Sequence, residues 1–386
     1  MNFTLKPYNQ DNMNLAIAQV NAIYGEEKIF INPDVDDPRW KRVELSIPSF
    51  NKILSNHYWG NRAGFALGAI YNFYGWESLG KSAAGLYIAG ELYKQGLGVH
   101  WIDGEGSFDA DYAKEAFGLN VYDKTGRCSL SNPINMEQAL DTVVSLVNNE
   151  AVNLIVFDSI ASFDGEEAIE KSAGEKSMAI PQRLLSQHFP KFISKARRSD
   201  IAIIYINQLR ANIKQGMAYG SKATGGNAMK FFPHVSLSFK KPQNGEIYKG
   251  DDYVGTEIEI TGEKNKTSRP KLFSSLMLYP GEGFSREADI INLAVKAGVI
   301  KKSGTWFSFN GENIGQGIDN VRSLMMQNPE LTAKVWDATK VILEPAIAPV
   351  IDIKTGEIIS EAPSTTEAEE KKVLGAKTKK SKTTTT

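Results

Sequence analysis

One segment of eight residues, Gly75-Trp76-Glu77-Ser78-Leu79-Gly80-Lys81-Ser82, fits the pattern G-x-x-x-x-G-K-[ST]. A strand-like run, AIYNFY, precedes it, and a helical pattern, AAGLYIAGELY, follows it. The two glycines let the backbone curl, so that successive N–H groups point at phosphate oxygens where a helix begins. Lys81 then supplies a positive charge to the β and γ phosphates, and the Ser82 hydroxyl ligates Mg²⁺. The segment therefore predicts a site for a nucleoside triphosphate and its magnesium ion.

Around this segment, from Ala69 to about Phe239, short apolar runs alternate with longer helical patterns. Buried strands that alternate with crossover helices are typical of a mostly parallel sheet covered on both faces. The runs are AIYNFYG, GVHWIDGE, NLIVFDS, IAIIYINQ and HVSLSFK, and the helical patterns include 82–95, 109–118 and 133–149. We expect an α/β fold that binds its ligand at the carboxyl ends of the strands.

Polar side chains stand at the ends of three of these runs. Asp158 ends an apolar strand, and a carboxylate there would hold the magnesium ion from the side opposite Ser82. Glu105 and Asp103 both close the run VHWIDGE, and either could orient and deprotonate an attacking water. The residues alone favour neither. Gln208 ends the run IAIIYINQ, where its amide is placed to sense a γ-phosphate and signal to the following loop.

The segment after Gln208, LRANIKQGMAYGSKATGGNAMKFF, combines four glycines with cationic residues and contains no acidic one. We expect an exposed loop that offers backbone N–H groups and positive charge to a phosphodiester chain. Its cationic residues are Arg210, Lys214, Lys222 and Lys230. A second exposed stretch, EEAIEKSAGEKSMAIPQR, lies between the strand that ends in Asp158 and the next helix, and it contributes Arg183.

Both ends of the chain lie outside the predicted core. Met13, Ile17, Val20 and Tyr24 have the spacing of one apolar helix face, and Gly25 follows as a candidate C-cap. After a strand pair, EIEITGEKNK and KLFSSLMLYP, residues 287–345 show a helical pattern around a turn, WFSFNGENIGQG. The expected domains are a helical arm and linker at 1–42, the core at 43–286, a small α/β domain at 287–346 and a disordered tail at 347–386.

Composition limits the classes of function. The chain has 386 residues, of which 42% are hydrophobic, so it can bury a full core. A formal net charge of -1 excludes the overall positive field of a histone-like coat protein, so any nucleic-acid contact must be local. With one cysteine, Cys128, and four histidines at unsuitable spacing, no zinc site is predicted. No signal peptide or membrane span is recognisable, and a reducing cytoplasm is the expected location.

Taken together, these motifs resemble the RecA recombinase family, which includes bacterial RecA and its phage-encoded relatives. GWESLGKS is similar to the family's G-P-E-S-S-G-K-T, WIDGEGSFDADYA to F-I-D-A-E-H-A-L-D-P-x-Y-A, and NLIVFDSIASF to V-I-V-V-D-S-V-A-A-L. YINQLR, TGGNAMKFF, KNK at 264–266 and GTWFSFNGENIGQG resemble further family motifs in the same order. The resemblance runs from about residue 12 to 345, and motifs in register over that length are far more specific than any single one.

The resemblance implies an ATP-dependent DNA recombinase with ATP and Mg²⁺ as cofactors. In the ATP site it implies Glu105 as the general base, Gln208 as the allosteric switch, Asp109 and Tyr112 as adenine contacts, and Lys264 and Lys266 as a pair that reaches the ATP of the adjacent subunit. From its spacing alone, the N-terminal helix is expected to pack on its own domain; the resemblance implies instead that it packs on the neighbouring protomer. A head-to-tail contact that does not close produces an open helical filament.

The same resemblance implies two DNA-binding loops, at 164–178 and at about 209–224. The implied DNA-binding positions are Arg183, Arg210, Lys214, Met217, Tyr219, Lys222, Gly225 and Gly226. Single-stranded DNA and a homologous duplex would be the partners, with loader or mediator proteins and without a membrane. Such a protein would act in recombination, DNA repair and the response to DNA damage.

Three features depart from the bacterial pattern. The first DNA loop differs in its residues, and Pro190 stands where the family usually has an arginine. Met217 and Tyr219 lie near a position where bacterial members carry a phenylalanine. The tail is basic, whereas bacterial members end in an acidic tail that restrains DNA binding; its lysines are Lys371, Lys372, Lys377, Lys379, Lys380 and Lys382.

Two other functions share some of these residues. A ring-shaped motor would use the same ATP residues, but the N-terminal helix and the GTWFSFNGENIGQG domain argue against it. A DNA-binding scaffold would use ATP only as an assembly ligand, and Glu105 argues against it because assembly needs no general base.

Overall fold

The computed structural model describes residues 10–24, 40–163, 179–214, 217–223, 228–343, 350–351 and 358–360. The chain divides into two compact units, Met1–Lys41 and Arg42–Thr386. In the first unit, α1 (Gln10–Tyr24) confirms the predicted N-terminal helix, and its Met13, Leu15 and Ile23 are exposed. The predicted cap at Gly25 lies outside the described residues.

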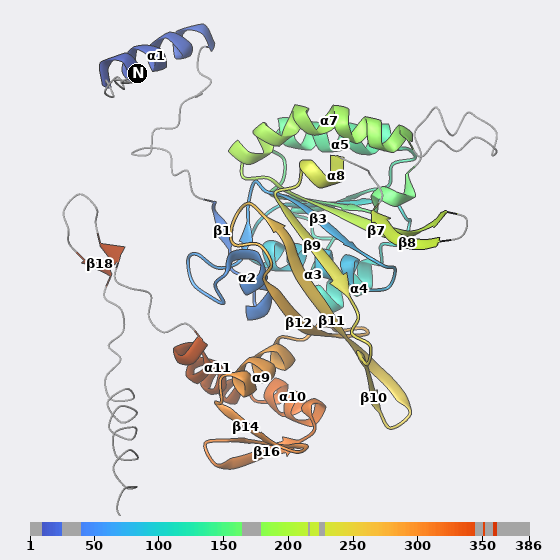
Figure 1. Ribbon diagram of the computed structural model, residues 1–386, viewed down its shortest axis with the longest axis vertical. Helices are drawn as coiled ribbons and strands as arrows, with labels where there is room; N and C mark the ends of the chain where they lie inside the picture. Colours follow the sequence, from blue (N-terminus) through green and yellow to red (C-terminus); the bar gives the residue numbers. More distant parts are fainter. Residues whose placement is uncertain are drawn as a thin grey trace, which may run out of the picture. The chain divides into compact units, whose positions relative to one another are not determined.

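The second unit is built on a large sheet with the strand order β13-β12-β11-β9-β3-β7-β6-β4-β5 (Figure 1). Its parallel part comprises β9 (Val235–Lys240), β3 (Ile70–Gly75), β7 (Ala202–Lys214), β6 (Leu154–Asp158), β4 (Val99–Asp103) and β5 (Cys128–Ser131). An antiparallel edge is added by β11 (Asp252–Asn265), β12 (Phe273–Tyr279) and β13 (Gly283–Phe284). The predicted α/β fold with a mostly parallel sheet is confirmed.

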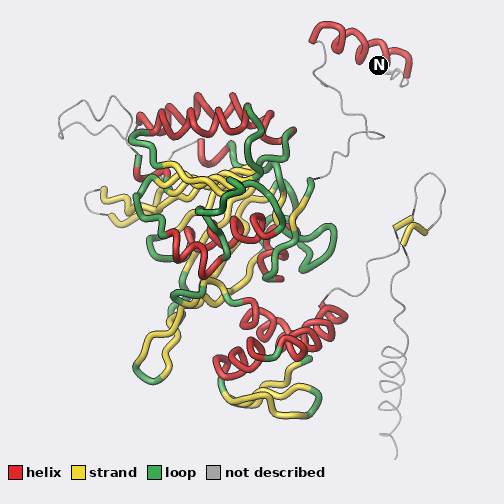
Figure 2. The backbone as a smooth tube through the Cα atoms, turned by 180° about the vertical axis from the view of Figure 1, so that it is seen from behind, coloured by secondary structure: helices red, strands yellow, loops and turns green. Residues whose placement is uncertain are grey.

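Helices cover both faces of the sheet (Figures 1 and 2). On one face, α5 (Met136–Asn148) and α7 (Ala179–Arg198) pack on Ile155 and Phe157 of β6. On the other face, α3 (Lys81–Lys94) approaches the neighbouring residue, Val156, at Gly85. Successive side chains of a strand point to opposite faces of the sheet. Because helices cover both faces, the residues of β6 before Asp158 are all apolar.

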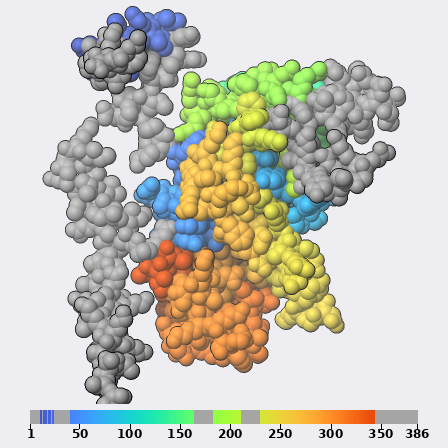
Figure 3. All heavy atoms as spheres, in the orientation of Figure 1, coloured from blue at the N-terminus to red at the C-terminus, as the bar shows by residue number. Residues whose placement is uncertain are grey.

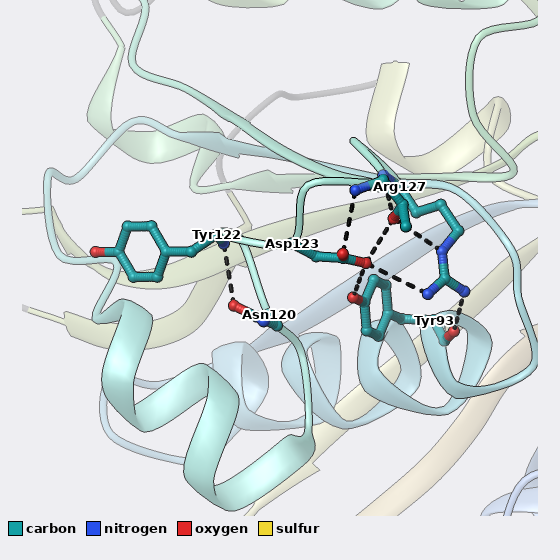
Figure 4. Close-up of polar contacts among 6 residues, drawn as sticks. Tyr93, Asn120, Tyr122, Asp123 and Arg127 are labelled. Carbon is teal, nitrogen blue, oxygen red and sulfur yellow. Dashed lines mark hydrogen bonds and ion pairs between the residues drawn. The ribbon is translucent and has the colours of Figure 1, made fainter.

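Short polar contacts fix the connections around α4 (Ala110–Phe117). Asp109 begins this helix by accepting the backbone N–H groups of Asp111 and Tyr112. Between α4 and β5, Asp123 accepts hydrogen bonds from the hydroxyl of Tyr93, at 2.5 Å, and from Arg127, at 3.3 Å (Figure 4). Since Tyr93 belongs to α3, this contact ties the α4–β5 connection to the helix that follows the phosphate loop.

Smaller elements complete the core. Near its start lie β1 (Arg42–Val43), α2 (Pro48–Ser55) and β2 (Phe65–Ala66), and η1 (Ile160–Ser162) follows β6. Further along, α8 (Ala228–Phe231) precedes β9, and β10 (Glu246–Lys249) pairs with β11 in a hairpin that projects from the sheet (Figures 1 and 3). None of the described helices has the length and apolar content needed to cross a membrane.

After the sheet the chain forms a small α/β domain. Its elements are α9 (Arg286–Lys296), β14 (Ile300–Ser303), β15 (Trp306–Phe309), β16 (Glu312–Gln316), α10 (Ile318–Gln327) and α11 (Pro329–Leu343). A separate core of buried side chains, among them Ile290, Phe307, Val321 and Trp336, holds these elements together. The segment predicted as a turn, WFSFNGENIGQG, consists of the hairpin of β15 and β16 in a three-stranded sheet.

Three predictions need correction. The strand predicted to end at Gln208 continues to Lys214 and pairs with β8 (Met217–Ala223), so much of the predicted loop is a hairpin. The physical reason is the alternation of Leu209, Ala211 and Ile213, a strand pattern that the glycines and cations concealed. Arg183 lies within α7, whereas the sequence predicted an exposed stretch before the helix; the side chain itself is exposed.

The third correction concerns the tail. The segment predicted to be disordered contains an antiparallel pair, β17 (Val350–Ile351) with β18 (Ile358–Ser360). Apolar residues on both sides of Lys354-Thr355-Gly356 give this short stretch a strand pattern. The prediction of disorder followed the polar composition of the rest of the tail. The other residues from 352 onward lie outside the described residues.

Candidate active site

The segment 75–82 connects the carboxyl end of β3 with the first turn of α3, as predicted. A Cβ atom at Gly75 would lie 2.6 Å from the carbonyl oxygen of Phe239, so any larger residue would collide with β9. Gly80 has a φ of 70° and is the N-cap of α3. That left-handed conformation favours glycine, and it turns the loop into the helix so that its N–H groups are directed at one point.

Lys81 folds back over this loop. Its Nζ donates a hydrogen bond to the carbonyl oxygen of Trp76 at 2.6 Å, and the residue is buried. Burial lowers the pKa of Lys81, and the carboxylates of Asp158, Glu105 and Glu77 oppose that change. A cation held among acidic groups in a partly dry site is suited to receive phosphate oxygens.

Asp158 lies at the end of β6 and is buried. Burial raises its pKa to about 7; a hydrogen bond with Ser82 opposes this rise, and the nearby Glu105 and Asp103 add to it. Among the described residues, no group of three or more acidic, histidine or cysteine side chains could hold a metal ion. A hard cation at Asp158 and Ser82 would therefore need further oxygen ligands, which phosphates and water provide.

The structure separates the two acidic residues that end the run VHWIDGE. Asp103 is buried, and its carboxylate accepts the backbone N–H groups of Glu105, Ser107 and Phe108 at 3.0–3.2 Å. It therefore holds the turn after β4. Glu105 is exposed, and its Oε1 accepts hydrogen bonds from Ser159 at 2.6 Å and from Gln208 Nε2 at 2.9 Å. Of these two acidic side chains, Glu105 is the one that faces the phosphate loop region.

Gln208 stands directly beside the phosphate loop because β3 and β7 are neighbours, with Gly75 paired to Gln208. The phosphate loop and the neighbouring strand ends enclose a cavity of about 360 Å³. It is lined by residues 77–83 and by Glu105, Asp158, Ile206 and Gln208. The structure thus brings together the predicted phosphate loop, metal ligands, general base and switch residue.

Of the predicted residues of the ATP site outside the phosphate loop, four do not line this cavity. Asp109 begins α4, and Tyr112 packs edge-on against Phe117 at 5.3 Å. Lys264 donates to the carbonyl oxygens of Lys230 and Phe231, at 2.9 and 3.0 Å, and its strand position pairs with Ser236. Ser236 in turn pairs with Asn72, three residues before Gly75.

That register places the Lys264 backbone about 10 Å along the strand from the start of the phosphate loop. The side chain of Lys266 is exposed. Neither lysine lines the cavity at Glu105 and Gln208, whereas Lys264 lines a second cavity of about 900 Å³ together with Trp76 and Leu79 of the phosphate loop.

The predicted DNA-binding positions are only partly described. The backbone of Arg210, Lys214, Met217, Tyr219 and Lys222 belongs to the hairpin of β7 and β8, with Arg210 paired to Lys222. Gly225, Gly226 and the predicted first loop at 164–178 lie outside the described residues.

Sequence reasoning missed two residues of the site. The hydroxyl of Ser159 donates to Glu105, and Ser162 donates to the same oxygen at 3.3 Å. Both follow β6 directly, and a serine next to the strand-ending acid was the available signal. These hydroxyls orient the carboxylate of Glu105 towards Gln208.

A phosphate loop between a central parallel strand and a helix, with an acidic residue at the end of a neighbouring strand, defines a P-loop nucleoside triphosphatase. A family model described as the RecA N-terminal domain matches residues 11–285, and one described as the RecA C-terminal domain matches residues 288–341. The chain belongs to the RecA family, as the sequence motifs predicted.

Relatives support this assignment. The protein RecA of Thioalkalivibrio sulfidiphilus is 36% identical over 274 residues, which cover 70% of this chain and 77% of that protein. The protein RecA of Geobacter sulfurreducens is 38% identical over 280 residues, covering 71% and 80%. Among solved structures, a RadB recombinase covers 57% of this chain at 21% identity with a TM-score of 0.42, a likeness too low to add to the assignment.

Membership of this family defines the activity. The protein is an ATP-dependent DNA recombinase that acts in homologous recombination and DNA repair, and it is a DNA-dependent ATPase. DNA binding and assembly into a filament belong to the same function.

Proposed function

We propose that the cavity at the carboxyl ends of β3, β4, β6 and β7 binds ATP with Mg²⁺, and that Glu105 is the general base of hydrolysis. When bound, ATP supplies the γ-phosphoryl group that water attacks, and the ion neutralises charge on the phosphates. The N–H groups of residues 75–82 and the ammonium of Lys81 bind the phosphates. Ser82 and Asp158 hold the ion, and the Glu105 carboxylate takes the proton of the water.

One observation carries this proposal: Gln208 Nε2 donates to Glu105 Oε1 at 2.9 Å. The general base and the switch residue are therefore in direct contact, beside the phosphate loop. Gln208 lies on β7, the strand that continues into the hairpin with β8. A change at Glu105 when the γ-phosphate is bound or lost would shift Gln208 and with it the hairpin.

We propose that this hairpin, with Arg183 and residues 164–178, binds DNA. The register places the cationic positions Arg210 and Lys222 opposite each other, and like charges at opposed positions destabilise a strand pair unless an anion binds there. Phosphate contacts of this kind give affinity without reading sequence. Met217 and Tyr219 supply the large side chains that could separate stacked bases.

Assembly completes the site in this proposal. Lys264 and Lys266 do not line the cavity that holds Glu105 and Gln208, and we propose that they act at the ATP of the next subunit. The arm at residues 1–42 would join neighbouring protomers, residues 43–286 would carry the ATP and DNA sites, and residues 287–346 the small domain. Single-stranded DNA would be coated first, a homologous duplex would then pair with it, and mediator proteins would assist loading.

The test compares Glu105→Gln with Asp103→Asn in an assay of DNA-dependent ATP hydrolysis. Loss of a general base should reduce turnover of Glu105→Gln by about 100- to 10,000-fold while ATP and DNA binding persist. Asp103→Asn should instead lower the free energy of unfolding, because it weakens the turn after β4. Glu312→Gln, an exposed change in the small domain, is the control. Unimpaired hydrolysis by Glu105→Gln would refute the assignment.

A further inference from the structure

The turn between β12 and β13 lies against the phosphate loop. At Gly80, an added Cβ atom would be 2.8 Å from Cδ2 of Leu278 and 3.3 Å from Cζ of Phe284. Leu278 lies at the end of β12, and Phe284 lies in β13. Side chains from both sides of this turn therefore pack around Gly80, whose φ is +70°.

The same turn also contacts α4. An added Cβ atom at Gly283 would lie 2.5 Å from Cε1 of Phe117, the last residue of that helix. Phe117 packs against Tyr112, one of the two residues that the resemblance to the RecA family implies as adenine contacts. Interiors are packed too closely for such contacts to move independently. A displacement of the turn would reach both the phosphate end and the base end of the proposed site.

On its other side, the turn is held by α10 of the small domain. The guanidinium carbon of Arg322 lies 3.9 Å from the ring centroid of Tyr279, and its Nε donates to the Ser285 hydroxyl at 2.9 Å. Arg322 also forms an ion pair with Glu282. Asp319, on the same helix, accepts the Tyr279 hydroxyl at 2.9 Å. The side chain of Arg322 is 10% exposed, so these partners enclose most of it.

We propose that Arg322 is a positioning residue for the nucleotide site, through which the small domain sets the affinity for ATP. Arg322 fixes residues 279–285, and these residues fix Gly80 and Phe117. A planar guanidinium binds a ring, a hydroxyl and a carboxylate at once, so it holds the turn in one arrangement. Because coupling is reciprocal, nucleotide binding also stabilises α10 against the turn. The inference rests on the proposed nucleotide site.

The first experiment measures the Kd of the full chain for a fluorescent N-methylanthraniloyl derivative of ATP. Arg322→Ala should weaken binding at least about 5-fold, the lower limit of ordinary coupling between sites. It should raise KM for ATP while kcat at saturation changes little. Arg322→Lys keeps the charge near Glu282 but loses the planar contacts, so its Kd should lie between those of the wild type and Arg322→Ala.

The control is Lys340→Ala, which removes a cation over the Trp336 ring, 5.6 Å away, and an ion pair with Asp337 in the same domain. Its Kd should equal that of the wild type. Equal weakening by both alanine variants would show loss of domain stability and would overturn the inference, as would an unchanged Kd in Arg322→Ala. If Arg322→Ala does not fold, Arg322→Lys decides by the same comparison.

Hydrogen exchange provides the second readout. In the wild type, the nucleotide should slow exchange in residues 279–285 and in α10. In Arg322→Lys, protection should persist in α3 and be reduced in α10. Protection of α10 that is the same in both proteins would contradict the inference. A wild type that binds no nucleotide would instead refute the proposed function, so the two failures are distinguishable.

Discussion

At Asp158, burial raises the carboxyl pKa from 3.8 to about 7, close to the pH at which the site must work. A protonated carboxyl cannot ligate Mg²⁺, so binding of magnesium and ATP must displace the proton. We predict that, in the presence of Mg²⁺, the Kd of the wild type for the N-methylanthraniloyl derivative of ATP decreases as pH rises from 6 to 8. Calorimetry in buffers of different ionisation enthalpy should show proton release on binding.

Asp158→Asn is the comparison for this prediction, because its side chain has no proton to lose. The variant should bind more weakly, and its Kd should change less over the same pH range. Titration of the phosphate itself is common to both proteins, so the difference between their pH profiles reports Asp158 alone. Identical profiles would show that Asp158 is not the group that titrates.

Single residues were predictable where the chemistry is local. The phosphate loop could be identified from its spacing, because Gly75, Gly80 and Lys81 act within one turn of chain. The choice between Asp103 and Glu105 could not be made from the residues, since it depends on which backbone N–H groups and which distant side chains each one meets. Asp103 meets its own turn, whereas Glu105 meets Ser159 and Gln208, 54 and 103 residues away.

Among the elements, the edge strand β5 is attached to β4 by a buried histidine. His100 contacts the hydroxyl of Ser129 through Nδ1, at 2.7 Å, and that of Ser131 through Nε2, at 2.9 Å. Burial lowers the pKa of His100 from 6.5 to about 4. Between these values the unfolded chain binds the proton and the folded chain does not. The free energy of unfolding therefore decreases as pH falls from about 6.5 towards 4.

We predict that His100→Gln, which keeps hydrogen-bonding capacity but cannot titrate, reduces this pH dependence. A shift of this size corresponds to at most roughly 3 kcal/mol. Urea unfolding at pH 7 and pH 5 should show a smaller difference for the variant than for the wild type. Some dependence should remain, because burial also lowers the pKa of His234 to about 4. An unchanged pH dependence would exclude His100 as a contributor.

Strands that are buried on both faces could be predicted from the sequence, and the β7–β8 hairpin could not. The central strands β3, β4 and β6 are buried on both faces, so their composition is mostly apolar and easily recognised. In the hairpin of β7 and β8, glycines and cations conceal the alternation of Leu209, Ala211 and Ile213, and the pairing of the two strands reveals it. Such pairing is a contact between segments, which local composition does not encode.

At the scale of the whole molecule, α1 belongs to a different compact unit from the sheet. An isolated helix of 15 residues is marginal in water and needs a surface to pack on. Its Met13 is 42% exposed, and Met13 and Val20 share the apolar face that the sequence predicted. In the proposed filament, the neighbouring protomer provides that surface. Sequence predicted the helix itself, but its spacing cannot specify a partner.

We therefore predict that Met13→Asp abolishes filament formation on circular single-stranded DNA with a slowly hydrolysed ATP analogue, as seen by negative-stain electron microscopy. A charge in an apolar contact costs free energy at every junction of the filament, so assembly fails cooperatively. Ala18→Asp, which adds the same charge on the side of α1 that carries Asp11 and Asn14, should leave continuous filaments. Both variants should bind the slowly hydrolysed ATP analogue as monomers, because the residues that line the phosphate cavity all lie between Glu77 and Gln208. Continuous filaments of Met13→Asp would mean that protomers join through another surface.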